Sequence, residues 1–301
     1  MDHASGSVLE VHDLHKSYGP THALNGLSFC APRNSFFGLF GRNGSGKTTC
    51  FDCVTGLLGR DRGRVVMLGE EVGMEPSPEL KQRFAYVGGH IGLYQWLTLE
   101  EHLEFVAGFY PSWDDARCRE LREVFRLPMQ QQAFGLSPGL HLQFQLLMAL
   151  SRHPELIIID EPGNIDPVVR LRLMQTITEI LRGEEATVLM ASHLLDELDG
   201  VCDQMCIIDA GSALMSGPVG ELTAGTQSVL FRGVKAPHLP AGPGVCFGPR
   251  KGDQVEAILI GYTPARAEAL ARDLQAESYE ASPVSLQDFF IATTEGRGAD
   301  Q

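Results

Sequence analysis

A glycine-rich loop at residues 41–49, with the sequence GRNGSGKTT, constrains this chain more than any other feature. The loop fits the phosphate-binding pattern G-x-x-x-x-G-K-[ST]. An apolar run at 35–40 precedes it and predicts a buried strand, and residues 47–58 predict a helix. Glycines let successive backbone N–H groups turn toward phosphate oxygens, and a helix N-terminus adds partial positive charge. We therefore expect a phosphate site formed by Gly41, Arg42, Asn43, Gly44, Ser45, Gly46, Lys47, Thr48 and Thr49.

Two side chains of the loop suit a bound triphosphate. Lys47 is expected to reach the β- and γ-phosphates, in a catalytic as well as a binding role, and the Thr48 hydroxyl is expected to bind Mg²⁺. A chance glycine-rich turn is a weak alternative, because by average composition the pattern arises in roughly one of a hundred chains of this length.

A second apolar run, at residues 156–159, ends in the two carboxylates Asp160 and Glu161. Four apolar residues without alternation predict a strand that is buried on both faces, as in a parallel sheet. Sheets of this kind bind ligands at the carboxyl ends of their strands. Asp160 is therefore predicted to hold Mg²⁺ through water, and Glu161 to orient and polarise an attacking water.

Two further residues are candidates for nucleotide contacts. His193 follows a predicted buried strand at 187–191, so it could contact the γ-phosphate, although a lone histidine is more often structural. Tyr18 lies in a predicted loop at 14–19 and could stack on a base. From these residues alone, a half-buried structural tyrosine is the favoured interpretation of Tyr18.

Composition and charge narrow the class of protein. The 301 residues suffice for about two domains. A net charge of −14 argues against wide nucleic-acid contact, because phosphate backbones demand a basic surface. With no apolar stretch near ~18 residues and a short polar N-terminus, we expect no signal peptide and a cytosolic chain that reaches a membrane only through a partner. The seven cysteines favour reduced core residues over disulfides or zinc ligands.

Helix start signals predict an all-helical insert at residues 92–135. Thr98 to Glu101 form a capping box for a helix to about residue 110, and a second helix follows to about 125. Ser137 is an N-cap, with Pro138 at the first position of a third helix. From about residue 225, frequent prolines and glycines separate short strands and helices, which predicts a small α+β appendage.

The order of these motifs resembles the ATP-binding subunit of ABC transporters over residues 8 to about 222. The resemblance identifies residues 41–49 as the Walker A loop and Asp160-Glu161 as Walker B. It further identifies Tyr18 as the A-loop aromatic and Leu136-Ser137-Pro138-Gly139-Leu140 as the signature motif. Asp166 is identified as the D-loop residue and His193 as the switch histidine.

This resemblance implies the fold and its division. Residues 1–224 are expected to form an α/β P-loop NTPase cassette with a mostly parallel core sheet, an antiparallel β subdomain and a helical subdomain at about 92–152. Residues 225–301 are expected to form the small C-terminal α+β subdomain.

The resemblance also implies the function. In this family two cassettes close head to tail over two ATP molecules with Mg²⁺, so Ser137 and Gly139 are expected to contact nucleotide bound by a second cassette. Asp166 is expected to be a further nucleotide-binding residue. That second cassette makes a homodimer or a heterodimer. Closure and hydrolysis drive a separate integral membrane permease from the cytoplasmic face of the membrane. The closing sequence Ser-Leu-Gln-Asp-Phe-Phe is similar to the end of exporter-type (ABC-2) ATPases.

Two departures from the family pattern affect the expected activity. The consensus signature LSGGQ is here Leu-Ser-Pro-Gly-Leu, which lacks one N–H at Pro138 and a polar side chain at Leu140. Gly89 stands where the family has the Q-loop glutamine, and His90 next to it is an unfavoured substitute. Because Glu161 and His193 are present, we expect an ATPase, slowed by the missing glutamine. The alternatives are a degenerate ATP-binding subunit that regulates a competent cassette, and a non-transport ABC ATPase.

Overall fold

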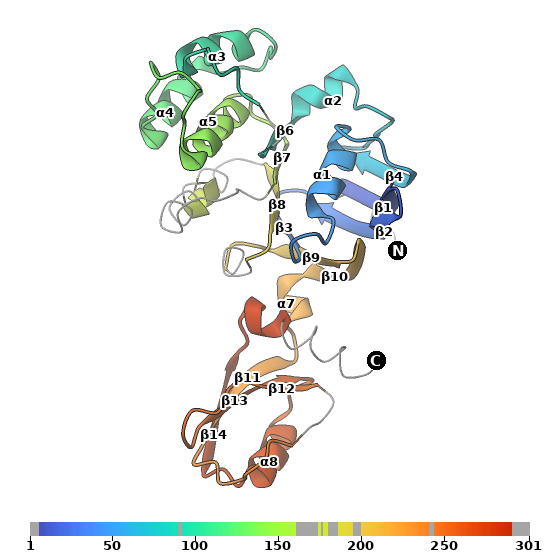
Figure 1. Ribbon diagram of the computed structural model, residues 1–301, viewed down its shortest axis with the longest axis vertical. Coiled ribbons are helices and arrows are strands. Elements are labelled where there is room, and N and C mark those ends of the chain that lie inside the picture. Colours follow the sequence, from blue (N-terminus) through green and yellow to red (C-terminus); the bar gives the residue numbers. More distant parts are fainter. Residues whose placement is uncertain are drawn as a thin grey trace. The chain divides into compact units, whose positions relative to one another are not determined.

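The computed structural model describes residues 6–89, 92–160, 174–175, 177–179, 186–194, 200–240 and 244–290. These residues divide into two compact units (Figure 1). The first lies within Met1–His193 and Gly200–Pro218, and the second within Leu194–Asp199 and Val219–Gln301. The sequence-based boundary after residue 224 stays a prediction.

A six-stranded sheet forms the centre of the first unit, in the order β10-β9-β3-β8-β7-β6. The bounds are β3 Phe36–Phe40, β6 Phe84–Val87, β7 Leu156–Ile159, β8 Thr187–Ser192, β9 Gln204–Asp209 and β10 Ser212–Pro218. Neighbours run parallel except for β10, which pairs antiparallel with β9. Every residue of β3, β7 and β8 is buried, as expected for parallel strands covered on both faces.

A four-stranded antiparallel sheet, ordered β2-β1-β4-β5, shares a core with the central sheet. Its strands are β1 Ser7–Tyr18, β2 Thr21–Pro32, β4 Arg62–Met67 and β5 Glu70–Glu71. Helix α1, Lys47–Thr55, contributes Phe51 to the core that both sheets share. Phe29 of β2 stacks on Phe37 of β3 with ring centroids 5.3 Å apart. The predicted loop at 14–19 is wrong, because β1 continues through it by pairing with β2 as far as Tyr18 and Thr21.

The first unit also contains the helices α2 Pro78–Arg83, α3 Leu99–Ala107, α4 Asp115–Phe125 and α5 Pro138–Leu150. Figure 1 shows α3, α4 and α5 gathered in one group. The predicted capping box of α3 is confirmed, since Thr98 and Glu101 exchange both bonds. The predicted cap of α5 is also confirmed, since Ser137 Oγ accepts a hydrogen bond from Leu140 N and Pro138 follows at the first position.

The second unit contains an antiparallel sheet ordered β12-β13-β11-β14, with bounds β11 Thr226–Arg232, β12 Val245–Phe247, β13 Val255–Ile260 and β14 Ser278–Pro283. Two helices accompany it, α7 Val219–Leu222 and α8 Pro264–Asp273. Phe231, Leu259 and Leu274 lie in its own hydrophobic core. Residues 286–290 are helical, and Ser285 Oγ accepts a hydrogen bond from Asp288 N at their start.

Four of the seven cysteines, Cys50, Cys53, Cys118 and Cys206, are buried. All seven cysteines are free, and Cys50 and Cys53 lie buried on α1. Burial raises the pKa of Cys53 to about 11, so its thiol is protonated at neutral pH. Within the described part of the chain, every helix is too short or too polar to cross a lipid bilayer.

Candidate functional site

The carboxyl ends of four parallel strands meet at one edge of the central sheet. Phe40 pairs with Ser192, and Ile159 pairs with both Val87 and Met190. Backbone hydrogen bonds continue just beyond the strand ends: Gly41 N donates to Ser192 O at 3.3 Å, and Asp160 N donates to Val87 O at 2.8 Å. Four segments therefore follow the strands at this edge: the glycine loop after β3, Asp160 after β7, His193 after β8 and Gly88 after β6.

The loop conformation requires its glycines. Gly44 and Gly46 have φ angles of +80° and +107°, in the left-handed region where a Cβ is strained. A Cβ on Gly41 would lie 2.3 Å from Ile208 O and 2.5 Å from Ser45 Oγ. The loop thus closes tightly against β9, whereas the Cβ position of Gly44 is open.

Lys47 is held against this loop. Its Nζ donates to Gly41 O at 2.7 Å and to Arg42 O at 3.2 Å, and the residue is only 6% exposed. Burial lowers the pKa of Lys47, and the negative charge of Asp160 opposes that shift. The ammonium group is therefore fixed in position at the loop, where it can neutralise a bound anion.

The hydroxyl of Ser45 tests whether the loop fits a phosphate. Ser45 Oγ is buried and has no hydrogen-bond partner in the described part of the molecule. Buried polar atoms are as a rule paired, because an orphaned group costs free energy. An orphaned hydroxyl inside a glycine loop, beside a fixed ammonium group, fits a ligand that carries hydrogen-bond acceptors.

A hydroxyl and a carboxylate meet next to the loop. Thr48 Oγ1 donates to Asp160 Oδ1 at 3.3 Å, and Tyr86 OH donates to Asp160 Oδ2 at 3.3 Å. Burial, and then the Asp160 charge, raise the pKa of Tyr86 far above its usual value, so the phenol stays a donor. Among the described residues there is no cluster of three or more His, Cys, Asp or Glu side chains placed to hold a metal. One carboxylate with one hydroxyl suits Mg²⁺, which keeps waters and phosphate oxygens as its other ligands.

Tyr18 lies at the end of β1 and is 51% exposed. The Lys16 ammonium group lies 5.9 Å from the centre of its ring. The ring is therefore open to solvent rather than packed in the core.

The signature residues lie at the N-terminus of α5. Ser137 is exposed and Gly139 is buried. Neither residue is hydrogen-bonded to loop 41–49 in the described part of the structure, so one chain does not bring them to its own phosphate loop. Glu161, Asp166 and His90 lie outside the described residues.

Two residues that the sequence analysis did not single out lie at the site. Tyr86 bonds Asp160, and Gln145 of α5 forms two hydrogen bonds with the backbone of Gly88. Tyr86 could have been predicted as a site residue, because it is an aromatic residue with a hydroxyl in the predicted strand at 84–87, close in sequence to Gly89. Gln145 could be noticed only as a polar residue on an apolar helix face.

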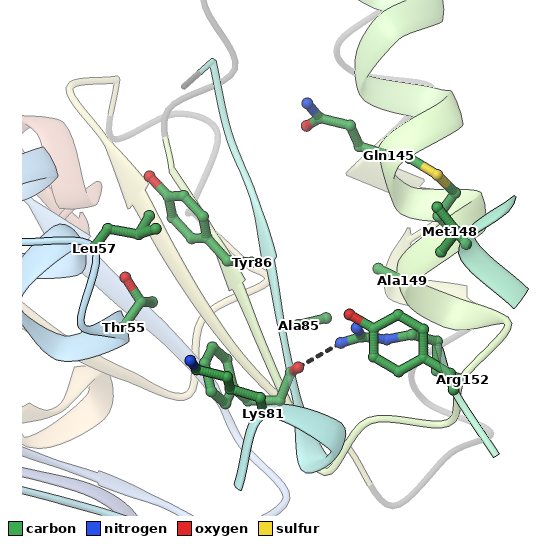
Figure 2. A pocket seen from close by; sticks show the side chains of 12 residues that line it. Thr55, Leu57, Lys81, Ala85, Tyr86, Gln145, Met148, Ala149 and Arg152 are labelled. Carbon is green, nitrogen blue, oxygen red and sulfur yellow. Dashed lines mark hydrogen bonds between the residues drawn. The ribbon is translucent and has the colours of Figure 1, made fainter. Parts of the chain in front are cut away.

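A cavity of about 380 Å³ opens near these residues (Figure 2). It is lined from α1 to α5 by Thr55, Leu57, Lys81, Phe84, Ala85, Tyr86, Val106, Tyr110, Gln145, Met148, Ala149 and Arg152. The Arg152 guanidinium lies 4.0 Å from the centre of the Tyr110 ring and donates to Phe84 O. The lining contains two cations and no carboxylate among the residues described.

Comparisons with known proteins agree with this geometry. A family model described as ABC transporter matches residues 24–164. The linearmycin resistance ATP-binding protein LnrL of Bacillus subtilis (strain 168) is 31% identical over 221 residues, covering 71% of this chain and 70% of that protein. The ABC transporter ATP-binding protein YtrB of the same organism is 24% identical over 300 residues, covering 96% and 99%.

Solved structures extend the likeness to the fold. An ATP-binding subunit of an ABC transporter has a TM-score of 0.63 and 29% identity, covering 72% of this chain and 92% of that chain. A nucleotide-free ATP-binding cassette has a TM-score of 0.59. The α/β P-loop cassette predicted from the sequence is thereby confirmed, and the chain belongs to the ATP-binding proteins of ABC transporters.

Proposed function

We propose that this chain is the ATP-hydrolysing subunit that powers a separate membrane permease in an ABC-2 type export system. The observation that carries the proposal is the meeting of the glycine loop, with its fixed Lys47 and orphaned Ser45 hydroxyl, and the Thr48–Asp160 pair at one sheet edge. Proteins of this family generally bind and hydrolyse ATP.

In this proposal, different residues at this sheet edge bind the phosphates, the metal ion, the attacking water and the adenine. The backbone N–H groups of residues 41–49 and the Lys47 ammonium group bind the phosphates, and Thr48 with Asp160 would hold Mg²⁺. A bound Mg²⁺ ion supplies positive charge between the β- and γ-phosphate oxygens. Glu161 orients the attacking water, His193 contacts the γ-phosphate, and the exposed Tyr18 ring stacks on the adenine.

A second cassette completes each site in this proposal. Ser137, Gly139 and Asp166 of one cassette face the nucleotide held by the other, in a homodimer or a heterodimer. The N-terminus of α5 suits an anion, because it adds partial positive charge and a serine hydroxyl. The exposed position of Ser137 supports this role. A structure similar in fold is a dimeric cassette bound to ADP and phosphate, with a TM-score of 0.62 and 19% identity.

The permease is proposed to contact the helical part of the chain. Four exposed aromatic side chains form a continuous series there: Trp96 contacts Tyr94 at 5.3 Å between ring centroids, Tyr94 contacts Phe105 at 5.6 Å, and Phe105 contacts Phe109 at 5.1 Å. Exposed contiguous apolar surface of this kind favours a protein partner. The chain would then lie on the cytoplasmic face of the membrane, as a cassette at 1–224 with a smaller subdomain at 225–301.

The proposal of export is supported by the closing sequence Ser-Leu-Gln-Asp-Phe-Phe, which is similar to the end of exporter-type ATPases. The relatives of this chain include proteins of both export and import systems. The lipopolysaccharide export protein LptB of Haemophilus influenzae is 31% identical over 219 residues, and the methionine import protein MetN of Mesorhizobium japonicum is 28% identical over 250 residues. A second candidate function, an ATP-binding subunit that regulates a competent cassette, is favoured by Gly89 and by the Leu-Ser-Pro-Gly-Leu signature. A non-transport ABC ATPase is disfavoured by the acidic charge if its substrate is a nucleic acid.

The test is the Mg-ATPase rate of the purified chain as a function of its own concentration, with Glu161→Gln as the inactive control. A rate that rises faster than linearly and vanishes in the variant supports a competent homodimer. ATP binding without hydrolysis at any concentration supports the regulatory subunit. To test the partner, a tagged copy of the chain is purified in mild detergent from membranes of its own organism, and its recovery without any membrane protein would contradict the permease.

A further inference from the structure

Gln145 forms a peptide-like pair of hydrogen bonds with a single backbone residue. Its Oε1 accepts from Gly88 N at 3.1 Å, and its Nε2 donates to Gly88 O at 3.1 Å. Gln145 is only 4% exposed, and its side chain leaves α5 in the direction of β6 (Figure 2). Both backbone groups of Gly88 are thus satisfied by one amide from another element.

A third contact fixes the orientation of this amide. Gln145 Nε2 lies 3.3 Å from His141 Nε2, one helical turn earlier. Because an amide nitrogen only donates, the imidazole nitrogen accepts there, and burial lowers the pKa of His141, which favours the neutral ring. The reversed amide would set two donors against each other at Gly88 N, so the pairing is directional.

The backbone that Gln145 holds is part of the metal-binding edge. A Cβ on Gly88 would lie 3.1 Å from Asp160 Cβ and 3.1 Å from Tyr86 OH. Gly88 therefore packs against the Cβ of Asp160, whose carboxylate Thr48 and Tyr86 contact. Gly89 offers no side chain here, and its Cβ position is open.

The helix that carries Gln145 begins at Ser137, eight residues or roughly 12 Å away along the helix axis. We propose that Gln145 is a positioning residue for ATP hydrolysis, which ties the Gly88 backbone and the neighbouring Asp160 to α5. A displacement of α5 then changes the position of the Asp160 carboxylate, which would hold Mg²⁺. This inference rests on the proposed ATPase function.

The test compares Gln145→Met and Gln145→Glu with the control Gln143→Leu. Met removes both bonds, and an ionised Glu keeps only the acceptor for Gly88 N. Gln143 lies on the same helix and is not a partner of Gly88. Melting curves first establish which variants are folded.

We expect the folded Gln145 variants to lose about 10-fold in kcat while the affinity for metal-free ATP changes by less than about 2-fold. The Mg²⁺ concentration for half-maximal activity should rise at least about 3-fold, which a general loss of packing would not produce. The control should match the wild type in all three quantities. Unchanged kcat and Mg²⁺ dependence in a folded Gln145 variant would overturn the proposal.

A second measurement uses only the wild-type chain and needs no turnover. Hydrogen exchange is followed in peptides covering residues 84–89 and 137–150, with and without Mg²⁺ and a non-hydrolysable ATP analogue. The proposal expects the two peptides to change protection together, and a change in one alone would contradict it. A wild type that binds the analogue but never hydrolyses ATP would remove the proposed function and leave this coupling test intact.

Discussion

The hydroxyl of Thr48 lies 3.3 Å from the carboxylate of Asp160, although 112 residues separate them in the chain. Thr48 lies in the first turn of helix α1, and Asp160 directly follows strand β7. The contact exists because parallel strands β3 and β7 end at the same edge of the sheet, with β8 between them.

Asp160→Asn should abolish the Mg²⁺ dependence of the site. The amide has nearly the same shape but carries no charge, so we expect hydrolysis to fall by roughly 10²-fold or more. The affinity for ATP in the presence of a chelator should change little, because the loop and Lys47 still bind the phosphates. Steady-state ATPase assays and fluorescent ATP titrations measure the two effects. Thr48→Ser, which keeps the hydroxyl, is the matched control, and an Asn variant with more than a third of the activity would refute the assignment.

Ser45→Ala should increase the stability of the nucleotide-free protein and weaken its affinity for ATP. Removing a buried hydroxyl that has no partner should raise the free energy of unfolding of the nucleotide-free protein by about 1 kcal/mol. The same change removes a group for the phosphates, so the Kd for ATP should rise about 5- to 10-fold. Urea unfolding and ATP titration are done on one preparation. A loss of stability without nucleotide would mean that the hydroxyl has a protein partner.

Gly41→Ala should disrupt the loop through contact rather than through dihedral strain. The added methyl would lie 2.3 Å from a backbone oxygen of β9, so we expect a loss of about 3 kcal/mol in unfolding free energy. Gly220→Ala is the matched control, because its Cβ position is open and it lies in helix α7. That control should gain up to about 1 kcal/mol. Equal stabilities for the two variants, measured by urea unfolding, would show that the loop can relax.

Glu155 should make stability fall in acid. A hydrogen bond from Arg83 is the largest cause that lowers the pKa of Glu155 below its ordinary 4.5; burial opposes this shift, and a weaker effect of the Arg33 hydrogen bond adds to it. A carboxyl whose pKa is lower in the folded state contributes stability above its unfolded pKa and loses it as pH falls through the folded pKa. Glu155→Gln should therefore be less stable than the wild type at pH 7, by less than about 1 kcal/mol because the group is partly exposed.

The unfolding free energies of Glu155→Gln and the wild type should converge as the pH falls below the unfolded pKa and then through the lower folded pKa of Glu155, because the wild-type carboxyl becomes protonated. Urea midpoints at pH 7, 5 and 3.5 give the comparison, and Glu104→Gln, an exposed change on α3, is the control. A constant difference between Glu155→Gln and the wild type at all three values would show that the contribution of Glu155 is not electrostatic.

The sequence alone determined the parts of this protein whose physics is local. The glycine loop, the helix caps at Thr98 and Ser137 and the apolar runs each reveal their structure within about ten residues, because turn strain, helix ends and strand burial depend on near neighbours. The family and the α/β cassette followed from the order of those parts. Strands β5, β10, β12 and β14 were missed, since polar, glycine-rich and proline-rich edges form strands only when a partner strand is present.

Only the tertiary structure decided which residues distant in sequence form hydrogen bonds with the motif residues. Tyr86 bonds a carboxylate 74 residues away, and Gln145 bonds a backbone 57 residues away. Tyr18 gains its exposed position from the pairing of β1 with β2, where the local sequence indicated a loop. The motifs specify their own backbone conformation, whereas the second partners of Asp160 and Gly88 depend on which strands and helices the whole fold sets side by side.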